Sequence, residues 1–358
     1  MIYYHVARGD SYDYLSKMSQ RLKHRGKYRL IVTSPPYYGH RHYGNALSEI
    51  GQETNDELFI DKLAKIFLIC RDLLTDDGSL WIVIGDTRRN YAKLLLPHRL
   101  ALKLIEKGKY IFREDIVWYK KNNISSSSNI NFSQAYELVL FFSKNERCFT
   151  NLDDVRTKGN EVMNRKSRLP DPDKIQYRAS KKDKSQIIKI QEIIHNAKST
   201  TPITDLPTTS QIASAYGYNP EKHCPTCHRK FKRHATRKRV GDHRHYPIFA
   251  VCNSRGKNPG NVWEIATKAH HGNEHFAIFP EDLVARIINF ATKKGDWVLD
   301  PFVGRGTTGI VCAHLGRNFF GIDLYSTNAA WSKRNIASVV LKQKMNLSKE
   351  KSIAIRPN

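Results

Sequence analysis

The chain has 358 residues, 40% of them apolar, and carries 59 lysine and arginine residues against 34 aspartate and glutamate residues, a formal net charge of +25. Its length accommodates one large domain with insertions or two domains, and the apolar fraction is sufficient for a sizeable core. So lopsided a charge favours a polyanionic partner over a role in solubility alone. Nucleic acid is favoured over a membrane, because no basic amphipathic helix or apolar anchor accompanies the charge.

No feature of the sequence predicts export or membrane insertion. Residues Met1–Val6 run directly into a polar turn at Gly9–Ser11, and no apolar run reaches transmembrane length. Six cysteines in a chain of this length do not form a disulfide framework. We therefore expect a cytoplasmic protein, intracellular in a prokaryote or in the host cell of a virus.

Residues 1–150 show strand and helix patterns in alternation. A strand is expected at Tyr28–Val32, and a helix follows at Asp56–Phe67 with acidic residues in its first turn, where they suit the helix dipole. Buried strands are expected at Leu80–Ile84 and Leu138–Phe142. Since residues 255–335 return to the same alternation, the pattern predicts an α/β fold with a parallel, doubly wound sheet.

The most informative segment is Thr33–Tyr38, which follows the first of these strands and reads T-S-P-P-Y-Y. Each proline lacks a backbone N–H and pushes the preceding residue toward extended geometry. The carbonyl groups of Ser34 and Pro35 are therefore expected to face outward as acceptors, beside the ring of Tyr37. Two acceptors and an aromatic face suit the exocyclic amino group of a nucleobase. In isolation, the same tetrapeptide would also suit a proline turn at a sheet edge.

The middle of the chain differs in amino-acid composition from the segments on either side. Residues 151–260 hold 23 Lys and Arg against 10 Asp and Glu, so this third of the chain supplies about half of the charge excess. Lys184–Ile194 suits one amphipathic helix, and Ser199–Ser210 is rich in threonine, serine and proline, as linkers are. We expect an inserted basic region here.

A cluster of cysteine and histidine lies inside this insert. Cys224 and Cys227 form a C-x-x-C pair, a common half-site for tetrahedral zinc. In a reducing compartment a metal is favoured over a disulfide, and also over a chance pairing among basic residues. A closed site would be structural and would fix a small basic module. The other ligands are expected to be Cys252 and one histidine, with His243 preferred over His234 and His245.

The C-terminal part carries a second set of signals. A helix is expected at Pro280–Thr292, and the strand Trp297–Asp300 leads through a glycine-spaced turn into a helix at Gly309–Leu315. Glycines let a backbone approach a ligand closely, and a helix start offers unpaired N–H groups. The next strand, Asn318–Asp323, ends in an acid at an offset that suits ribose hydroxyls. The tail at 342–358 is polar and basic and is expected to be frayed.

With both signals present, the chain resembles the β-class of DNA amino-methyltransferases, which move a methyl group from S-adenosylmethionine to N4 of cytosine or N6 of adenine. The S-P-P-Y element stands first and the D-P-F-x-G-x-G-T-T element last, which is the permuted order of that class, and the match covers roughly residues 1–150 and 255–340. The resemblance implies a Rossmann-like, S-adenosylmethionine-dependent methyltransferase sheet of seven strands, one of them reversed.

The resemblance also implies that successive segments of the chain have different functions. Residues 1–150 would be the catalytic half, 151–258 an inserted basic target-recognition region, 259–341 the cofactor-binding half and 342–358 a tail. The partner would be double-stranded DNA whose target base has left the duplex. The sequence leaves a homodimer open, and no membrane is expected.

Two groups of residues receive roles from this resemblance. The catalytic group comprises Ser34, Pro35, Pro36 and Tyr37, with Tyr37 stacked on the target base. The cofactor group comprises Asp300, Phe302, Gly304, Gly306, Thr307, Asp323, Phe276 and Pro280. Within it, Asp323 would hold the ribose, where the family more often has glutamate. Arg305 stands where the family usually has a small residue, which leaves the local cofactor contacts open.

The residue that begins the first motif bears on the base. Adenine-specific members usually have aspartate or asparagine there, whereas serine is typical of cytosine-N4 enzymes, so Ser34 predicts a site-specific DNA (cytosine-N4) methyltransferase, in a restriction–modification system or alone. An N6-adenine enzyme is the alternative. Enzymes that act on RNA or on protein glutamine usually show the two motifs in the reverse order. A DNA-binding protein with an HNH-like nuclease insert is less favoured, because Phe249 stands where that motif expects a cysteine.

Overall fold

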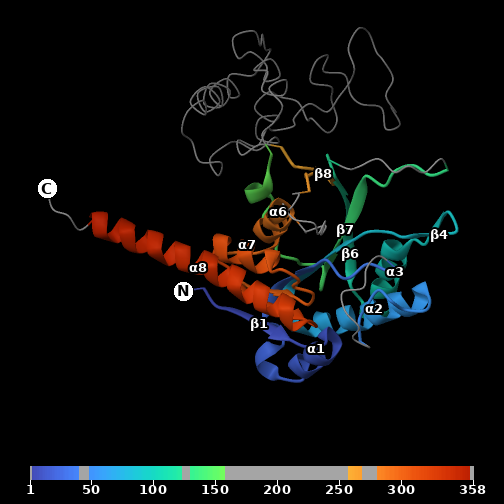
Figure 1. Cartoon of the computed structure of the whole chain (residues 1–358), viewed down its shortest axis with the longest axis horizontal. Helices are drawn as coiled ribbons and strands as arrows, with labels where there is room; N and C mark the ends of the chain where they lie inside the picture. The colour runs from blue at the N-terminus through green and yellow to red at the C-terminus, as the bar shows by residue number, and fades with distance from the viewer. Residues whose placement is uncertain (1, 40–47, 123–129, 158–256, 268–279, 355–358) are drawn as a thin grey trace, which may run out of the picture. The chain divides into compact units, whose positions relative to one another are not determined.

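The computed structural model describes residues 2–39, 48–122, 130–157, 257–267 and 280–354 (Figure 1). The chain divides into two compact units, Met1–Val155 with Asn258–Asn358, and Arg156–Lys257. In the second unit, Thr157 and Lys257 form an antiparallel bridge. Every element discussed below belongs to the first unit.

The first unit is built on a sheet of eight strands. In spatial order they are β1 (Tyr4–Arg8), β10 (Asn318–Asp323), β9 (Trp297–Asp300), β2 (Tyr28–Thr33), β3 (Leu74–Ile84), β7 (Tyr136–Ser143), β6 (Ile111–Tyr119) and β8 (Val262–Glu264). Only β7 runs antiparallel to its neighbours; the other adjacent pairs are parallel. The expectation of one reversed strand is confirmed, but the sheet has one strand more than the expected seven, because β8 pairs with the outer edge of β6.

Helices cover both faces of the sheet (Figure 1). One layer contains α1 (Ser11–Ser19), α2 (Asp56–Leu73) and α3 (Leu96–Gly108), and the other contains α6 (Glu281–Ala291), α7 (Thr307–Leu315) and α8 (Ser326–Ala354). The strands serve both layers because their side chains alternate between faces. In β3, for example, Leu80 and Ile82 join the core beneath the first layer, while Trp81 and Val83 join the second. The predicted α/β class with a doubly wound sheet is confirmed.

Several bounds differ from the sequence-based expectation. The strand at Tyr28 continues to Thr33, the helix at Asp56 continues to Leu73, and α7 already begins at Thr307. The tail expected to fray is instead helical as far as Ala354. Residues 342–354 contain no glycine or proline and are rich in lysine and other good helix formers, so nothing in them ends the helix.

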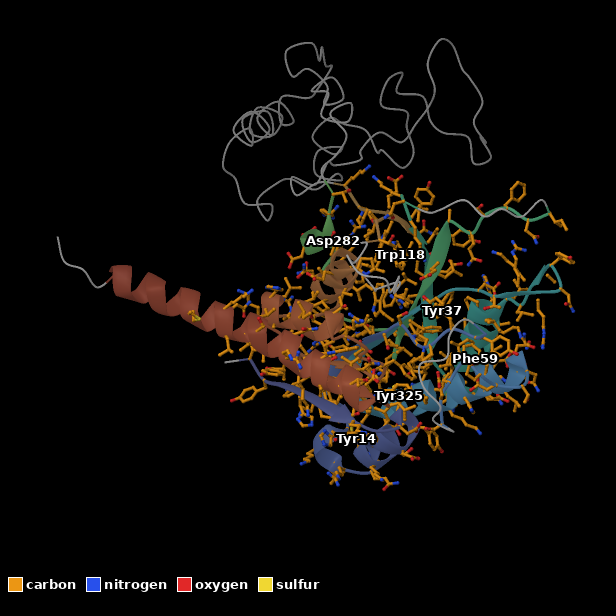
Figure 2. The ribbon with its side chains drawn as sticks, viewed as in Figure 1. Tyr14, Tyr37, Phe59, Trp118, Asp282 and Tyr325 are labelled. Atoms are coloured by element: carbon orange, nitrogen blue, oxygen red, sulfur yellow. The ribbon has the colours of Figure 1, made fainter. Side chains whose placement is uncertain are left out.

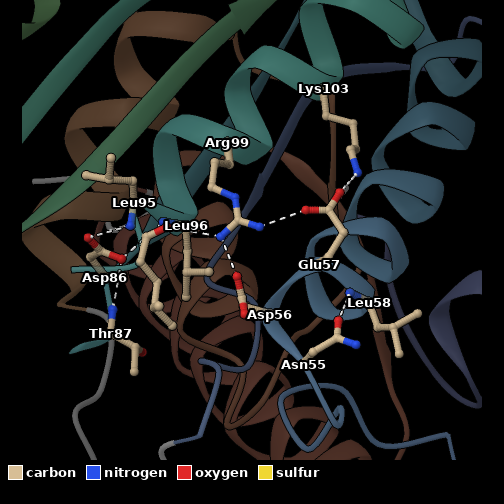
Figure 3. A network of polar contacts seen from close by, with 11 residues as sticks. Asn55, Asp56, Glu57, Leu58, Asp86, Thr87, Leu95, Leu96, Arg99 and Lys103 are labelled. Carbon is tan, nitrogen blue, oxygen red and sulfur yellow. Dashed lines mark hydrogen bonds and ion pairs between the residues drawn. The ribbon is translucent and has the colours of Figure 1, made fainter. Parts of the chain in front are cut away.

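A polar network fixes the start of α3 at the end of β3 (Figure 3). The Asp86 carboxylate accepts hydrogen bonds from the N–H groups of Leu95 and Leu96, at 3.1 and 3.0 Å, and so satisfies donors that the first helical turn leaves open. Arg99 of α3 then bridges Asp56 and Glu57 in the first turn of α2. Asp86 thus anchors a helix.

The cysteines of the described residues are free thiols. Cys70 and Cys312 are buried free thiols whose pKa is raised by burial. Within the described ranges, no helix has both the length and the apolar character needed to cross a bilayer.

Candidate active site at the carboxyl ends of the strands

A cleft of about 520 Å³ lies at the carboxyl ends of β2, β3, β9 and β10. In an open α/β sheet this edge is where ligands bind. Nine of the residues that the sequence singles out line it: Ser34, Pro35, Pro36, Tyr37, Asp300, Phe302, Gly304, Thr307 and Asp323. The two motifs, which stand at opposite ends of the sequence, therefore meet in one cavity.

Two more of the predicted site residues are described and lie outside the lining of the cleft. Gly306 is packed against α8 and Pro280 caps the start of α6, and neither is among the described residues that line the cleft. The candidates Phe276, Cys224, Cys227, His243 and Cys252 fall outside the described residues. Within the described part of the chain, no group of three or more His, Cys, Asp and Glu side chains is placed to bind a metal ion.

The Ser34–Tyr37 turn presents acceptors to the cleft. Pro35 and Pro36 supply no N–H, and no described residue donates a hydrogen bond to the Pro35 carbonyl. The Ser34 hydroxyl lies 3.4 Å from the Tyr37 hydroxyl, which itself donates a hydrogen bond of 2.7 Å to Oε2 of Glu137. The three side chains form a chain of polar contacts along the wall of the cleft.

An ion pair between Glu137 and Lys120 supports the wall of the cleft that carries Tyr37. Glu137, at the start of β7, is buried and also binds the ammonium group of Lys120. The Lys120 ammonium lies 4.9 Å from the ring centre of Trp118, a favourable cation–π position. Both Lys120 and Trp118 line the cleft with Tyr37. Trp118 and Tyr37 are labelled in Figure 2. This wall of the cleft thus combines aromatic rings, a cation and an anion.

Asp300 ties the two halves of the site together. Its buried carboxylate accepts hydrogen bonds of 2.6 Å from the hydroxyls of Thr33 and Thr308, and one of 3.0 Å from the N–H of Phe302. Burial raises the pKa of Asp300 to about 6, and these hydrogen bonds oppose that rise. Since Thr33 ends β2 and Thr308 belongs to α7, this carboxylate fixes the S-P-P-Y turn against the glycine loop.

Asp323 ends the neighbouring strand and holds the glycine loop. Its Oδ2 accepts from the N–H of Gly304 at 2.9 Å, while Oδ1 accepts from Tyr325 N–H at 2.9 Å and from the Asn328 amide at 3.1 Å. A carboxylate has about four acceptor positions, so one on Oδ2 is left for a ligand in the cleft. Burial raises the pKa of this group as well.

The long helix α8 closes on the glycine loop. Ser332 donates a hydrogen bond of 2.6 Å to the Gly304 carbonyl, and Asn335 donates one of 3.0 Å to the Arg305 carbonyl. A Cβ on Gly306 would lie 3.0 Å from the Ser332 Cα, so only glycine allows this close approach. Arg305 stacks over the ring of Trp331 at 4.7 Å, and both residues line the cleft.

Sequence reasoning missed several residues of the cleft. Asp10 and Ser11 follow β1, which lies beside β10 in the sheet, while Lys120 directly follows β6 and Glu137 belongs to β7. An acid shortly after a strand was a usable signal for Asp10. No local pattern singles out Lys120, because Glu137, which its ammonium group binds, comes from β7.

A family model for DNA methylases that modify N6 or N4 amino groups matches residues 28–333. The chain belongs to this family. It is therefore a DNA amino-methyltransferase by descent, and the resemblance inferred from the two motifs is confirmed. The permuted order of the motifs is accommodated by the sheet, since β2 and β9 lie side by side.

Among the curated relatives of this methylase are two bacterial type II enzymes. The type II methyltransferase M.Cfr9I of Citrobacter freundii is 27% identical over 328 residues, which cover 84% of this chain and 78% of the relative. M.SfiI of Streptomyces fimbriatus is 27% identical over 381 residues, covering 88% of this chain and 87% of the relative. Both alignments extend across the basic insert as well as the catalytic unit.

A solved structure of a DNA methyltransferase has a similar fold. A structure named as the PvuII cytosine-N4-specific DNA methyltransferase superposes with a TM-score of 0.54 and 16% sequence identity, covering 95% of this chain and 92% of that one. The Rossmann-like methyltransferase fold expected from the sequence is thereby confirmed.

Proposed function

We propose that this methylase transfers the methyl group of S-adenosylmethionine to the exocyclic N4 amino group of cytosine in duplex DNA, at a base rotated out of the helix. One observation carries the proposal: the Ser34–Tyr37 turn and the glycine loop at Gly304 line the same cleft. A direct transfer requires base and cofactor to meet at one point, and positioning is the main task of an enzyme whose methyl donor is already activated.

The cofactor half of the cleft fits S-adenosylmethionine. Gly304 has a φ of 51°, and a Cβ there would meet nothing within 4 Å, so its backbone borders open space. The open acceptor position on Asp323 suits a ribose hydroxyl. When bound, the cofactor supplies a methyl group on a positively charged sulfur. Phe302 and Thr307 complete this side of the cleft.

The target amino group would be held by two acceptors. Ser34 Oγ and the Pro35 carbonyl would take its two hydrogens and turn the nitrogen lone pair out of the ring plane. As the N–C bond forms, the nitrogen becomes positively charged, so these acceptors bind the transition state more tightly than the ground state. Tyr37 and Trp118 offer aromatic surface on which the extruded base can stack.

A route for the departing proton follows from the polar contacts of the turn. The nitrogen must release one proton once it carries the methyl group. The Ser34 hydroxyl can accept it while passing its own proton to Tyr37, whose hydroxyl already donates to Glu137. The Lys120 ammonium group binds the other oxygen of this carboxylate and fixes its position. The proton would thus leave the base without entering the cofactor side of the cleft.

The choice of cytosine rests on Ser34. A neutral hydroxyl is a weaker acceptor than the carboxylate or amide that usually begins the motif in adenine-specific enzymes. The other wall contacts described above would serve either base, so this residue alone carries the distinction.

The test is incubation of the purified protein with S-adenosylmethionine and mixed-sequence duplex DNA, followed by mass spectrometry of the digested nucleosides. N4-methylcytosine is the expected product. N6-methyladenine would overturn the choice of base and leave the family assignment intact. In parallel, Ser34→Ala is expected to lower methylation by about 100-fold while cofactor affinity stays unchanged; a fully active variant would contradict the role of the hydroxyl.

A further inference from the structure

A basic and aromatic surface borders the target side of the cleft. We call it the rim face, and it consists of Arg88, Arg89, Tyr91, Lys93 and Phe132. The first four belong to a hairpin of β4 (Arg88–Arg89) and β5 (Ala92–Lys93) that directly follows the carboxyl end of β3 (Figure 1). Phe132 lies in the segment that leads into β7. Because β7 is antiparallel, its start lies at the same edge of the sheet.

Contacts join the two parts of the rim face to each other and to the cleft. The guanidinium of Arg88 donates a hydrogen bond of 3.2 Å to the side chain of Asn131. The Lys93 ammonium lies 5.1 Å from the ring centre of Tyr136 and 3.3 Å from its hydroxyl. Tyr136 itself lines the cleft, so the rim face begins where the proposed base pocket ends.

The hairpin tip holds Tyr91 in an unusual backbone conformation. Asn90 and Tyr91 both have positive φ, 48° and 66°, as the two central residues of a type I′ turn do. Such turns strongly favour Asn-Gly, because a side chain such as tyrosine is sterically disfavoured in the left-handed region. The ring gains nothing from the core in return, since Tyr91 is 69% exposed.

Phe132 presents a second aromatic ring to solvent. Its side chain is 97% exposed, the largest value among the exposed large hydrophobic residues of the described chain. Single exposed apolar residues are ordinary on protein surfaces. Here, however, two rings flank a set of cations, and residues 87–95 contain three basic residues and no acidic one.

The geometry points to the rim face as a contact surface for the DNA duplex beside the target base: its cations bind phosphates, and Tyr91 and Phe132 stack on bases exposed when the target leaves the helix. Cations interleaved with aromatic rings suit nucleic acid, and apolar side chains that enter a base step occur in proteins that distort the duplex. The inference rests on the proposed extrusion of the base. It means that described residues outside the basic insert contact the duplex next to the cleft.

The decisive variant is Tyr91→Gly, because glycine is the preferred residue at this turn position. The variant should fold with a Tm equal to or above that of the wild type. Its Kd for a labelled mixed-sequence duplex, measured by fluorescence anisotropy, should nevertheless rise about 10-fold, as loss of one stacked base predicts. The matched control is Tyr3→Ser, which removes an exposed tyrosine at the opposite end of the strands and should leave the Kd unchanged.

Two further variants separate stacking from charge. Phe132→Ser should weaken duplex binding as Tyr91→Gly does, without changing the salt dependence, and Leu22→Ser, at an 83% exposed position before β2, is its control. Arg89→Ala should lower the slope of log Kd against log salt by about one. Wild-type duplex affinity in both aromatic variants would overturn the inference. The product nucleoside does not enter these measurements, so N6-methyladenine would change the proposed function and leave this result standing.

Discussion

The hydroxyl of Tyr37 donates a hydrogen bond of 2.7 Å to Glu137, a residue one hundred positions later in the chain. This contact joins the turn after β2 to the start of β7, and Lys120 holds the other carboxylate oxygen of Glu137. The hydroxyl of Tyr37 is therefore held from the start of β7, and its backbone by its own turn after β2. A base that stacks on the ring of Tyr37 would meet a surface fixed before binding.

Tyr37→Phe and Glu137→Gln test whether this contact carries a proton. Each change keeps the shape of the wall and removes one member of the proposed route, so kcat should fall by about 10-fold or more in each, with unchanged cofactor Kd. Because both act on one route, the double variant should resemble the single ones. Measured kcat values whose losses multiply in the double variant would contradict a shared route.

Gly85→Ala tests the placement of the ring. A Cβ at Gly85 would lie 3.1 Å from Cε2 of Tyr37 and 3.5 Å from Cγ of Glu137, so the ring must shift by a few tenths of an ångström. Methylation should drop by about 10-fold, as misplacement of a reacting group predicts, while unfolding free energy changes by about 1 kcal/mol. Cofactor affinity serves as the internal control, and an equally large loss there would show that the change spreads beyond the base pocket.

Asp300→Asn tests the buried carboxylate at the junction of the two motifs. The folded-state pKa of Asp300, about 6, lies above its ordinary value of 3.8, so folding favours the protonated form. Its contribution to stability is present below pH 4 and is lost as the pH rises to about 6, on the order of 3 kcal/mol in total. Asparagine can still accept from Thr33 and pair with Thr308 but does not titrate.

The measurement for this prediction is the free energy of unfolding of both proteins from pH 4 to pH 7. The stability of the wild type relative to the variant should decline across that window, while acids with lowered pKa, such as Asp56, affect both proteins alike. A difference that is independent of pH would show that Asp300 is charged throughout.

The zinc site stays a prediction from the sequence, and metal analysis of the purified protein tests it. About one zinc per chain is expected, and Cys224→Ser or Cys227→Ser should lower that content. Cys148→Ser, at a half-buried free thiol in the catalytic unit, is the matched control. Metal-free protein with full activity and an unchanged Tm would remove the claim.

Much of the fold could be predicted because its signals are local. The strands Trp297–Asp300 and Asn318–Asp323 have the bounds that their apolar runs and terminal acids indicate. The S-P-P-Y turn and the glycine loop were recognisable because proline and glycine restrict or extend the backbone by themselves. The structure brings them together in one cleft, since parallel strands share their carboxyl edge.

The rest depends on contacts between distant segments. The three-residue strand β8 exists because it pairs with β6, and its own sequence has no strand pattern long enough to be read. Lys120 belongs to the site only because Glu137 and Tyr37 arrive from other strands. The strained tip at Tyr91 breaks the local preference of its turn, and such departures tend to mark functional positions.

The pairing of β2 with β9 has a consequence for synthesis. Thr33 and Asp300, which touch at this junction, are 267 residues apart, so a ribosome completes the first strands long before their partners emerge. During that interval β2 lacks its neighbour on one side, and β1 has none until β10 is made. Unpaired strand edges invite wrong partners, and such distant pairings form slowly. A nascent chain therefore has no assembled cleft until β9 and β10, which supply Asp300 and Asp323, have been translated.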